Sequence, residues 1–130
     1  MTGIDTNILV RFFAQDDPDQ SRRVDEVLQL FSSRNPGFVT SVVVAELAWV
    51  LRKQYGVSKT QFIGYIEQLL DSPEIVLEHE SALKLALIRC SRANVDIADC
   101  LIERICAEAG CTQTVTFDEG AAKLAGMRLL

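Results

Sequence analysis

Residues 38–51 read FVTSVVVAELAWVL, and this run contains the basic unit of the predicted fold. Its first three residues predict a brief strand. Ser41 predicts the N-cap of a helix that runs to Tyr55 and ends at Gly56. A strand followed directly by a helix is the repeating unit of α/β proteins.

Strand and helix patterns alternate on both sides of this run. Asn35-Pro36-Gly37 predicts a turn, and Pro18 suits the first position of a helix. Ser58 and Gln61 predict a capping box that opens a further helix, which Pro73 ends. The expected strands are residues 1–4, 38–40, 75–77, 112–117 and 127–130, and the other expected helices are residues 7–14, 19–33, 80–93, 96–109 and 119–125.

The order of these elements predicts an α/β fold. We expect a single domain over residues 1–130, with a central, mainly parallel β-sheet flanked by helices on both faces. Ligands of such sheets bind at the carboxyl ends of the strands, so chemistry-bearing residues are sought there.

Composition excludes several classes of protein. The chain has 13 Lys and Arg against 18 Asp and Glu, a net charge of −5, which argues against nucleic-acid binding by bulk positive charge. Apolar residues make up 48%, so the chain is not a disordered tail. No apolar run approaches the ~20 residues of a membrane helix, and residues 1–5 do not resemble a signal peptide. We expect a cytoplasmic protein.

The four cysteines are expected to be reduced thiols in the core. They have no C-x-x-C spacing, and a single histidine cannot complete a Cys/His zinc set. They are Cys90, Cys100, Cys106 and Cys111.

Glu46 stands out because nine of residues 42–51 are apolar and it is the tenth. A carboxylate there is costly to desolvate unless a partner offsets the cost. It either reaches solvent or an arginine such as Arg11 or Arg52, or it lines a cleft and binds a cation.

Asp5 and Asp118 each follow a predicted strand. Both fit helix caps or turns, as do Thr6 and Asn7 beside Asp5. The other interpretation is a pair of strand-end carboxylates in a site, supported by the Thr116 hydroxyl.

Asp96 and Asp99 open the helix over residues 96–109. Their i, i+3 spacing places them on one helix face. Asp96 suits the N-cap, and Asp99 suits the first turn, where the helix dipole favours a negative charge. Asp99 can also point into a cleft while Asp96 caps the helix.

Taken together, the acids predict one metal site. Asp5, Glu46, Asp99 and Asp118 converge at one sheet edge in the predicted topology. Four carboxylates suit Mg²⁺ or Mn²⁺, which prefer oxygen ligands.

The chain resembles PIN-domain proteins, and most closely the VapC-type toxin ribonucleases. The resemblance rests on Ile4-Asp5-Thr6-Asn7, Ala45-Glu46-Leu47, Asp96-Ile97-Ala98-Asp99 and Val115-Thr116-Phe117-Asp118. It differs after Asp99, where an alanine is frequent in the family and this chain has Cys100, followed by Glu103 and Arg104.

The resemblance implies a Mg²⁺- or Mn²⁺-dependent endoribonuclease that is the toxin of a type II toxin–antitoxin pair. It assigns metal binding and catalysis to Asp5, Glu46, Asp99 and Asp118, with Glu46 either a ligand or the residue that orients the attacking water. The supporting residues are Asp96, Thr116, Thr6 and Asn7. The implied partners are RNA, a small antitoxin protein and a second copy of the chain. Candidate RNA contacts are Arg11, Arg22, Arg23, Arg52 and Lys53.

Two other classes of enzyme fit the pattern less well. A haloacid-dehalogenase-like phosphatase needs a second aspartate where Asn7 stands, and a receiver domain needs a central strand that ends in aspartate. A PIN-like module that binds RNA or protein without cutting remains the alternative, although all four acids are present.

Overall fold

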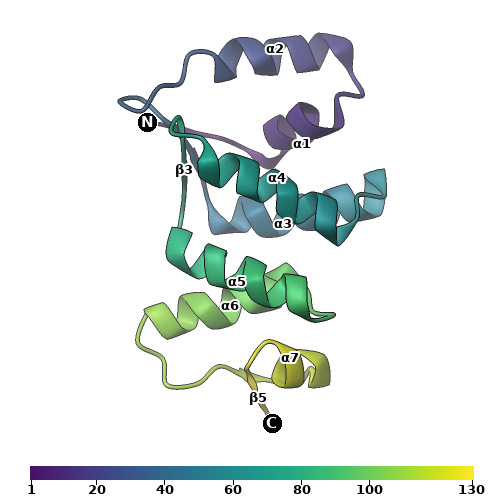
Figure 1. The fold of residues 1–130 in the computed structure, drawn as a ribbon, viewed down its shortest axis with the longest axis vertical. Helices are drawn as coiled ribbons and strands as arrows, with labels where there is room; N and C mark the ends of the chain where they lie inside the picture. The colour runs from purple at the N-terminus through teal and green to yellow at the C-terminus, as the bar shows by residue number, and fades with distance from the viewer. The chain divides into compact units, whose positions relative to one another are not determined.

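Short strands and longer helices alternate along the chain, as the apolar spacing predicts. A computed structural model describes residues 1–130, which divide into two units, Met1–Glu78 and His79–Leu130 (Figure 1). The first unit contains β1 (Thr2–Gly3), α1 (Thr6–Ala14), α2 (Pro18–Leu28), β2 (Gly37–Val39), α3 (Ser41–Tyr55), α4 (Lys59–Asp71) and β3 (Ile75–Leu77). The second contains α5 (Glu80–Arg92), α6 (Ile97–Glu108), β4 (Val115–Thr116), α7 (Glu119–Leu124) and β5 (Arg128–Leu129).

The first unit is built on a three-stranded parallel sheet in the order β1-β2-β3. Parallel neighbours need a crossover between them, which α1 and α2 supply before β2, and α3 and α4 before β3. Helix α1 packs against both α2 and α3. The core of this unit includes Leu9, Val39, Val44, Leu47, Leu51 and Ile66, which are all fully buried.

The second unit packs α5 against α6 around Leu83, Cys90, Cys100 and Leu101. Its strands β4 and β5 form a separate two-stranded parallel ladder. The α/β class and the parallel pairing are therefore confirmed, but the strands form two separate sheets instead of one central sheet. Each strand of the second sheet has only two residues, and the strand expected over 112–117 is only Val115–Thr116.

Capping residues fix most helix boundaries. The capping box of Ser58 and Gln61 is confirmed, and Pro18 is at the start of α2, where Asp17 accepts a hydrogen bond from the backbone N–H of Gln20. The prediction that Ser41 caps α3 was wrong. Thr40 is the N-cap, and its hydroxyl accepts from the N–H of Val43 at 3.1 Å.

The cysteine prediction holds for the two residues at the α5–α6 interface. Cys90 and Cys100 are buried, and burial raises the pKa of the Cys100 thiol to about 11. The core prediction was wrong for Cys111, which is exposed because it follows the end of α6. None of the four cysteines forms a disulfide. No helix is both long and apolar enough to cross a membrane.

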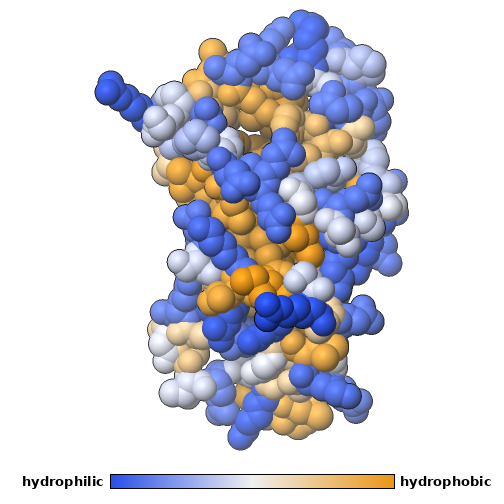
Figure 2. All heavy atoms as spheres, viewed as in Figure 1, coloured by the Kyte–Doolittle hydropathy of each residue, from blue (hydrophilic) through white to orange (hydrophobic).

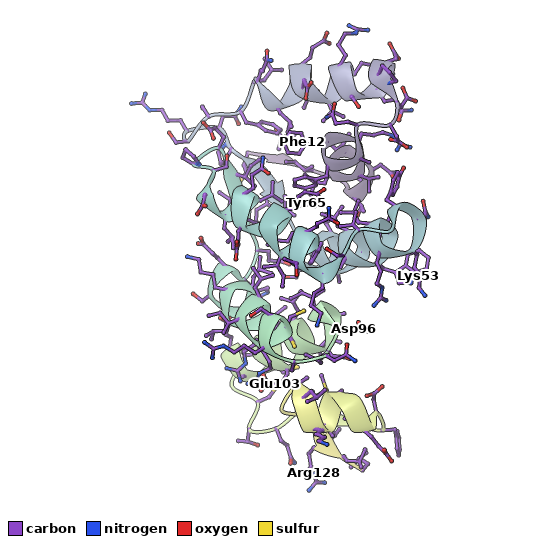
Figure 3. The ribbon with its side chains drawn as sticks, turned by 45° about the vertical axis from the view of Figure 1, so that its right-hand side comes forward. Phe12, Lys53, Tyr65, Asp96, Glu103 and Arg128 are labelled. Carbon is purple, nitrogen blue, oxygen red and sulfur yellow. The ribbon has the colours of Figure 1, made fainter.

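A hollow of about 430 Å³ opens among α1, α2, α4 and β3 of the first unit. Figure 2 shows apolar residues around it beneath α2, and Figure 3 shows Phe12 of α1 at this level. Its lining is mainly apolar and includes Leu9, Phe12, Leu28, Phe31, Leu69 and Ile75, with Asp25 and Glu74 among its acidic residues.

Gly37 was expected in a turn, but it begins the central strand β2 and is buried. A Cβ atom at this position would lie 2.5 Å from Cδ1 of Ile4 and 2.8 Å from Cε2 of Phe31. Phe31 reaches this place because α2 ends at Leu28, before the expected end at residue 33. The absence of a side chain at residue 37 therefore lets the chain after α2 pack onto the sheet.

We expect Gly37→Ala to lower the free energy of unfolding by about 1–3 kcal/mol, because overpacking displaces Ile4 or Phe31. Gly64→Ala is the matched control, since a Cβ in this part of α4 meets nothing within 4 Å and should stabilise the helix by about 0.5–1 kcal/mol. Denaturant unfolding measures both variants. Equal stability of the two would contradict the tight packing inferred at Gly37.

Candidate functional site

The second unit brings three of the predicted acids together. Asp99 lies in the first turn of α6, and its pKa is raised, first by partial burial and then by the negative charges of Asp118 and Asp96. Like charges interact in this way only when their carboxylates are near one another. The start of α6 and the end of β4 therefore form one negatively charged cluster.

Asp96 occupies the N-cap position of α6, but its side chain makes no capping hydrogen bond. The capping role expected for its carboxylate is therefore wrong, although its place at the helix start is right. Figure 3 shows Asp96 at the start of α6, with Glu103 further along the helix. The carboxylate of Asp96 instead adds to the negative potential at Asp99.

Asp118 is held on both sides by local hydrogen bonds. Its Oδ1 accepts from the backbone N–H of Ala121 at 2.7 Å and so caps α7. Its own backbone N–H donates to the hydroxyl of Thr116 at 3.0 Å. The predicted cap is confirmed, and Thr116 supports the aspartate through its backbone.

An ion-pair network lies behind this cluster. Glu103 of α6 accepts from Arg104 at 2.6 and 2.7 Å and from Arg89 of α5 at 3.3 Å. The hydrogen bond with Arg104 is the main cause of the lowered pKa of Glu103. Arg89 also donates to the carbonyl of Ala125 at the end of α7. Of the two residues that differ from the resemblance, Glu103 links α6 to α5 through Arg89, and Arg104 pairs with Glu103 on the same helix.

In the first unit, Asp5 occupies the N-cap position of α1 without a capping hydrogen bond from its side chain. Its Oδ2 accepts a long contact from Nδ2 of Asn7 at 3.4 Å. Asp5 and Asn7 are exposed, whereas Thr6 is buried. The predicted N-cap position of Asp5 is therefore confirmed, but its carboxylate contacts Asn7 instead of capping the helix.

Glu46 is exposed on α3. The helix buries Val43, Val44, Leu47 and Leu51 on its other side, so the carboxylate escapes the desolvation that the apolar sequence implied. Val42 and Trp49, one turn away on either side, are 75% and 53% exposed. Glu46 therefore reaches solvent, and its role in cation binding stays a prediction.

Comparison with known families identifies the chain. A family model of the PIN domain matches residues 4–127. The chain belongs to the PIN-domain family. The match spans both units, and it includes every acid discussed above. No curated protein gave a significant match.

The PIN domain is a nuclease fold, which supports a nuclease role and a nucleic-acid substrate for this chain. No group of three or more His, Cys, Asp or Glu side chains lies close enough together to hold a metal ion. In the second unit Asp96 and Asp118 lie near enough to Asp99 to raise its pKa, and in the first unit Asp5 and Glu46 are exposed.

Several cations that the sequence offered as nucleic-acid contacts are engaged elsewhere in this PIN domain. Arg11 pairs with Asp16 at 3.0 Å and donates to Tyr55. Arg22 pairs with Asp19 and Glu26 on α2. A phosphate at either guanidinium would share it with these carboxylates.

Sequence reasoning missed two features of the second unit. One is the Arg89–Glu103 contact, which a charged residue on each of two adjacent apolar helices could have indicated. The other is Phe117, the most exposed large apolar side chain of the chain, between Thr116 and Asp118. The strand expected over 112–117 included Phe117 in its alternating pattern, but β4 ends at Thr116, so Phe117 lies outside it.

We expect Asp99→Asn to stabilise the metal-free protein at neutral pH by a few tenths of a kcal/mol, the size of interactions between partly exposed charges. Because the pKa of Asp99 is raised, the folded state binds its proton more tightly than the unfolded chain. Stability is therefore lost as pH rises from the ordinary carboxyl pKa through the raised one. The Asp99→Asn variant does not lose stability in this way, because its amide does not titrate.

Thermal unfolding in EDTA across the acidic and neutral range measures this difference. Glu67→Gln on the exposed side of α4 is the control, since it removes a carboxyl charge outside the cluster. Destabilisation of Asp99→Asn at neutral pH, or an unchanged pH slope, would contradict mutual repulsion among the acids.

Proposed function

We propose that this chain is a Mg²⁺- or Mn²⁺-dependent endoribonuclease that acts in the cytoplasm as the toxin of a type II toxin–antitoxin pair. The observation that carries the metal dependence is the cluster of Asp96, Asp99 and Asp118. Folding holds these like charges near one another and partly buries Asp99, at a cost in free energy that a bound cation would offset.

The donor chemistry of the cluster fits this class of ion. All the donors are carboxylate oxygens, which Mg²⁺ and Mn²⁺ prefer. Asp5 makes no capping hydrogen bond to its own helix, and Asp118 uses only Oδ1 for its cap. When bound, a divalent ion would supply Lewis-acid stabilisation of the phosphodiester charge and lower the pKa of a water.

We assign the ligand set to Asp5, Glu46, Asp99 and Asp118, and we treat both units as one nuclease domain. Support comes from the PIN match, which includes these positions. The exposure of Glu46 leaves its carboxylate accessible either to the ion or to the attacking water. Asp96, Thr116 and Asn7 are positioning residues, because each acts on a neighbouring aspartate. Thr6 supports Asp5 from its buried position at the start of α1.

The proposed protein partners are an antitoxin and a second copy of the chain. Exposed Val42 and Trp49 on α3 support burial of this face by another protein. The apolar hollow beside α2 offers a second surface of the same character. RNA is the proposed substrate because the PIN match favours a nucleic acid and the resemblance favours RNA.

We expect millimolar Mn²⁺ to raise the melting temperature of the EDTA-treated protein by several degrees. An ion that binds only the folded state adds about 2.7 kcal/mol to the free energy of unfolding when its concentration is a hundred times the dissociation constant. Asp99→Asn should respond much less, and Glu67→Gln should respond as the unaltered chain does. A melting curve that Mn²⁺ leaves unchanged would argue against a preformed cation site.

We expect the purified chain to cleave a total-RNA pool at discrete positions with Mn²⁺, and EDTA should abolish the cuts. Asp99→Asn should lower the rate by roughly a hundredfold or more, because losing a charged ligand removes several kcal/mol of transition-state stabilisation. Electrophoresis and mapping of the cut ends measure the effect. Glu67→Gln is the matched control.

Each outcome of this assay is informative. Equal cleavage by Asp99→Asn would indicate a contaminating nuclease or a wrong site. Binding of Mn²⁺ and RNA without any cleavage would favour the non-cutting PIN-like module instead.

A further inference from the structure

One face of the β4–β5 ladder combines exposed apolar and cationic side chains. Val115 of β4 pairs in register with Arg128 of β5, so their side chains share a face. Val115 is 49% exposed and Arg128 is exposed. Phe117 lies just past the end of β4, two residues after Val115, and is 83% exposed. We call these three exposed residues the ladder face.

The backbone around Phe117 is fixed by hydrogen bonds on both sides. The carbonyl of Thr116 accepts from the N–H of Leu130 at 2.9 Å, and the Thr116 hydroxyl accepts from Asp118. Asp118 is in turn bonded to Ala121. Phe117 is therefore an aromatic residue on an ordered segment, directly before an acid of the candidate site.

Arg128 lies outside the ion-pair network that Arg89 and Arg104 form in the second unit. Arg89 and Arg104 both pair with Glu103, whereas none of the ion pairs of this unit involves Arg128. Figure 3 shows its side chain pointing away from the unit. An exposed guanidinium without a carboxylate partner is available to an external anion.

We propose that the ladder face binds single-stranded RNA beside the cleavage site. Phe117 stacks on an unpaired nucleobase, and Arg128 contacts a phosphate of the same strand. This inference rests on the proposed nuclease function. It explains how a chain with a net charge of −5 holds a polyanion, because one ring and one cation act where bulk charge does not.

The chemistry of the face favours a single strand over other occupants. An aromatic ring next to a cation is the usual arrangement for sequence-tolerant binding of unpaired bases. Bases in a duplex expose no ring face for stacking, and the grooves of duplex RNA are contacted mainly by shape.

The first test is binding of fluorescein-labelled oligouridylate to Asp99→Asn protein, which does not cut it, with Mg²⁺ present. Adding Phe117→Leu should weaken binding about tenfold or more, the range for loss of a stacked base, and Phe117→Tyr should retain it. Adding Arg128→Gln should reduce the slope of log affinity against log salt by about 0.7.

Matched controls lie in the same unit. Leu85→Ala removes a 50% exposed side chain from α5, and Lys123→Gln removes an exposed cation from α7. Both should leave affinity within about twofold. An unchanged affinity in Phe117→Leu, or an equal loss in Leu85→Ala, would overturn the proposal, as would the absence of any binding to the single strand.

A spectroscopic test identifies the occupant directly. In Trp49→Phe/Phe117→Trp/Asp99→Asn protein the only tryptophan is at residue 117. Oligouridylate should quench its emission, and a duplex of the same length should not. A blue shift that depends on protein concentration without RNA would instead show burial by a second copy and overturn the proposal.

Failure of this inference is distinguishable from failure of the proposed function. Cleavage that requires Asp99 but proceeds with unaltered KM in Phe117→Leu and Arg128→Gln would leave the nuclease standing and reject the ladder face. Stacking at residue 117 without cleavage by the unaltered chain would support the face and reject the nuclease.

Discussion

The guanidinium of Arg89 joins three helices of the second unit. It extends from α5 to Glu103 on α6 and to the carbonyl of Ala125 at the end of α7. Asp99 lies one turn before Glu103 on α6, and Asp118 opens α7. The distance between these two acids therefore depends on how firmly Arg89 holds the two helices. Because Glu103 is only 13% exposed, the contact is shielded from solvent more than a surface ion pair.

Local sequence signals predicted the helices well, because caps and apolar spacing act within a few residues. Ser58, Gln61 and Pro18 each define a boundary by contacts within one helical turn. The strands were less predictable, since a ladder of two residues depends on its partner and carries almost no pattern of its own. Gly37 shows the same limit: only Ile4 and Phe31, distant in sequence, reveal why the strand begins there.

The acids of the candidate site are predicted from their position along the chain, but their surroundings could not be predicted in this way. The apolar neighbours of Glu46 suggested desolvation, yet helical geometry turns it to the exposed side of α3. Asp5 and Asp96 stand at N-cap positions without capping their helices, which no sequence rule distinguishes from true caps. The coupling of Asp99 to Asp118 joins residues separated by a helix and a loop, and it required the structure.

Asp118 has two duties within one carboxyl group. Its Oδ1 closes the first turn of α7, a helix of only six residues, while its charge belongs to the acidic cluster. Substitutions that abolish the charge therefore also unravel the turn, unless the new side chain is itself a good N-cap such as asparagine. A descendant of this chain that no longer cut nucleic acid would still be selected for a capping residue here. Conservation of residue 118 among relatives would consequently reflect selection for folding as well as for catalysis. Conservation of Asp99, which lies inside the first turn of α6, would reflect mainly selection for catalysis.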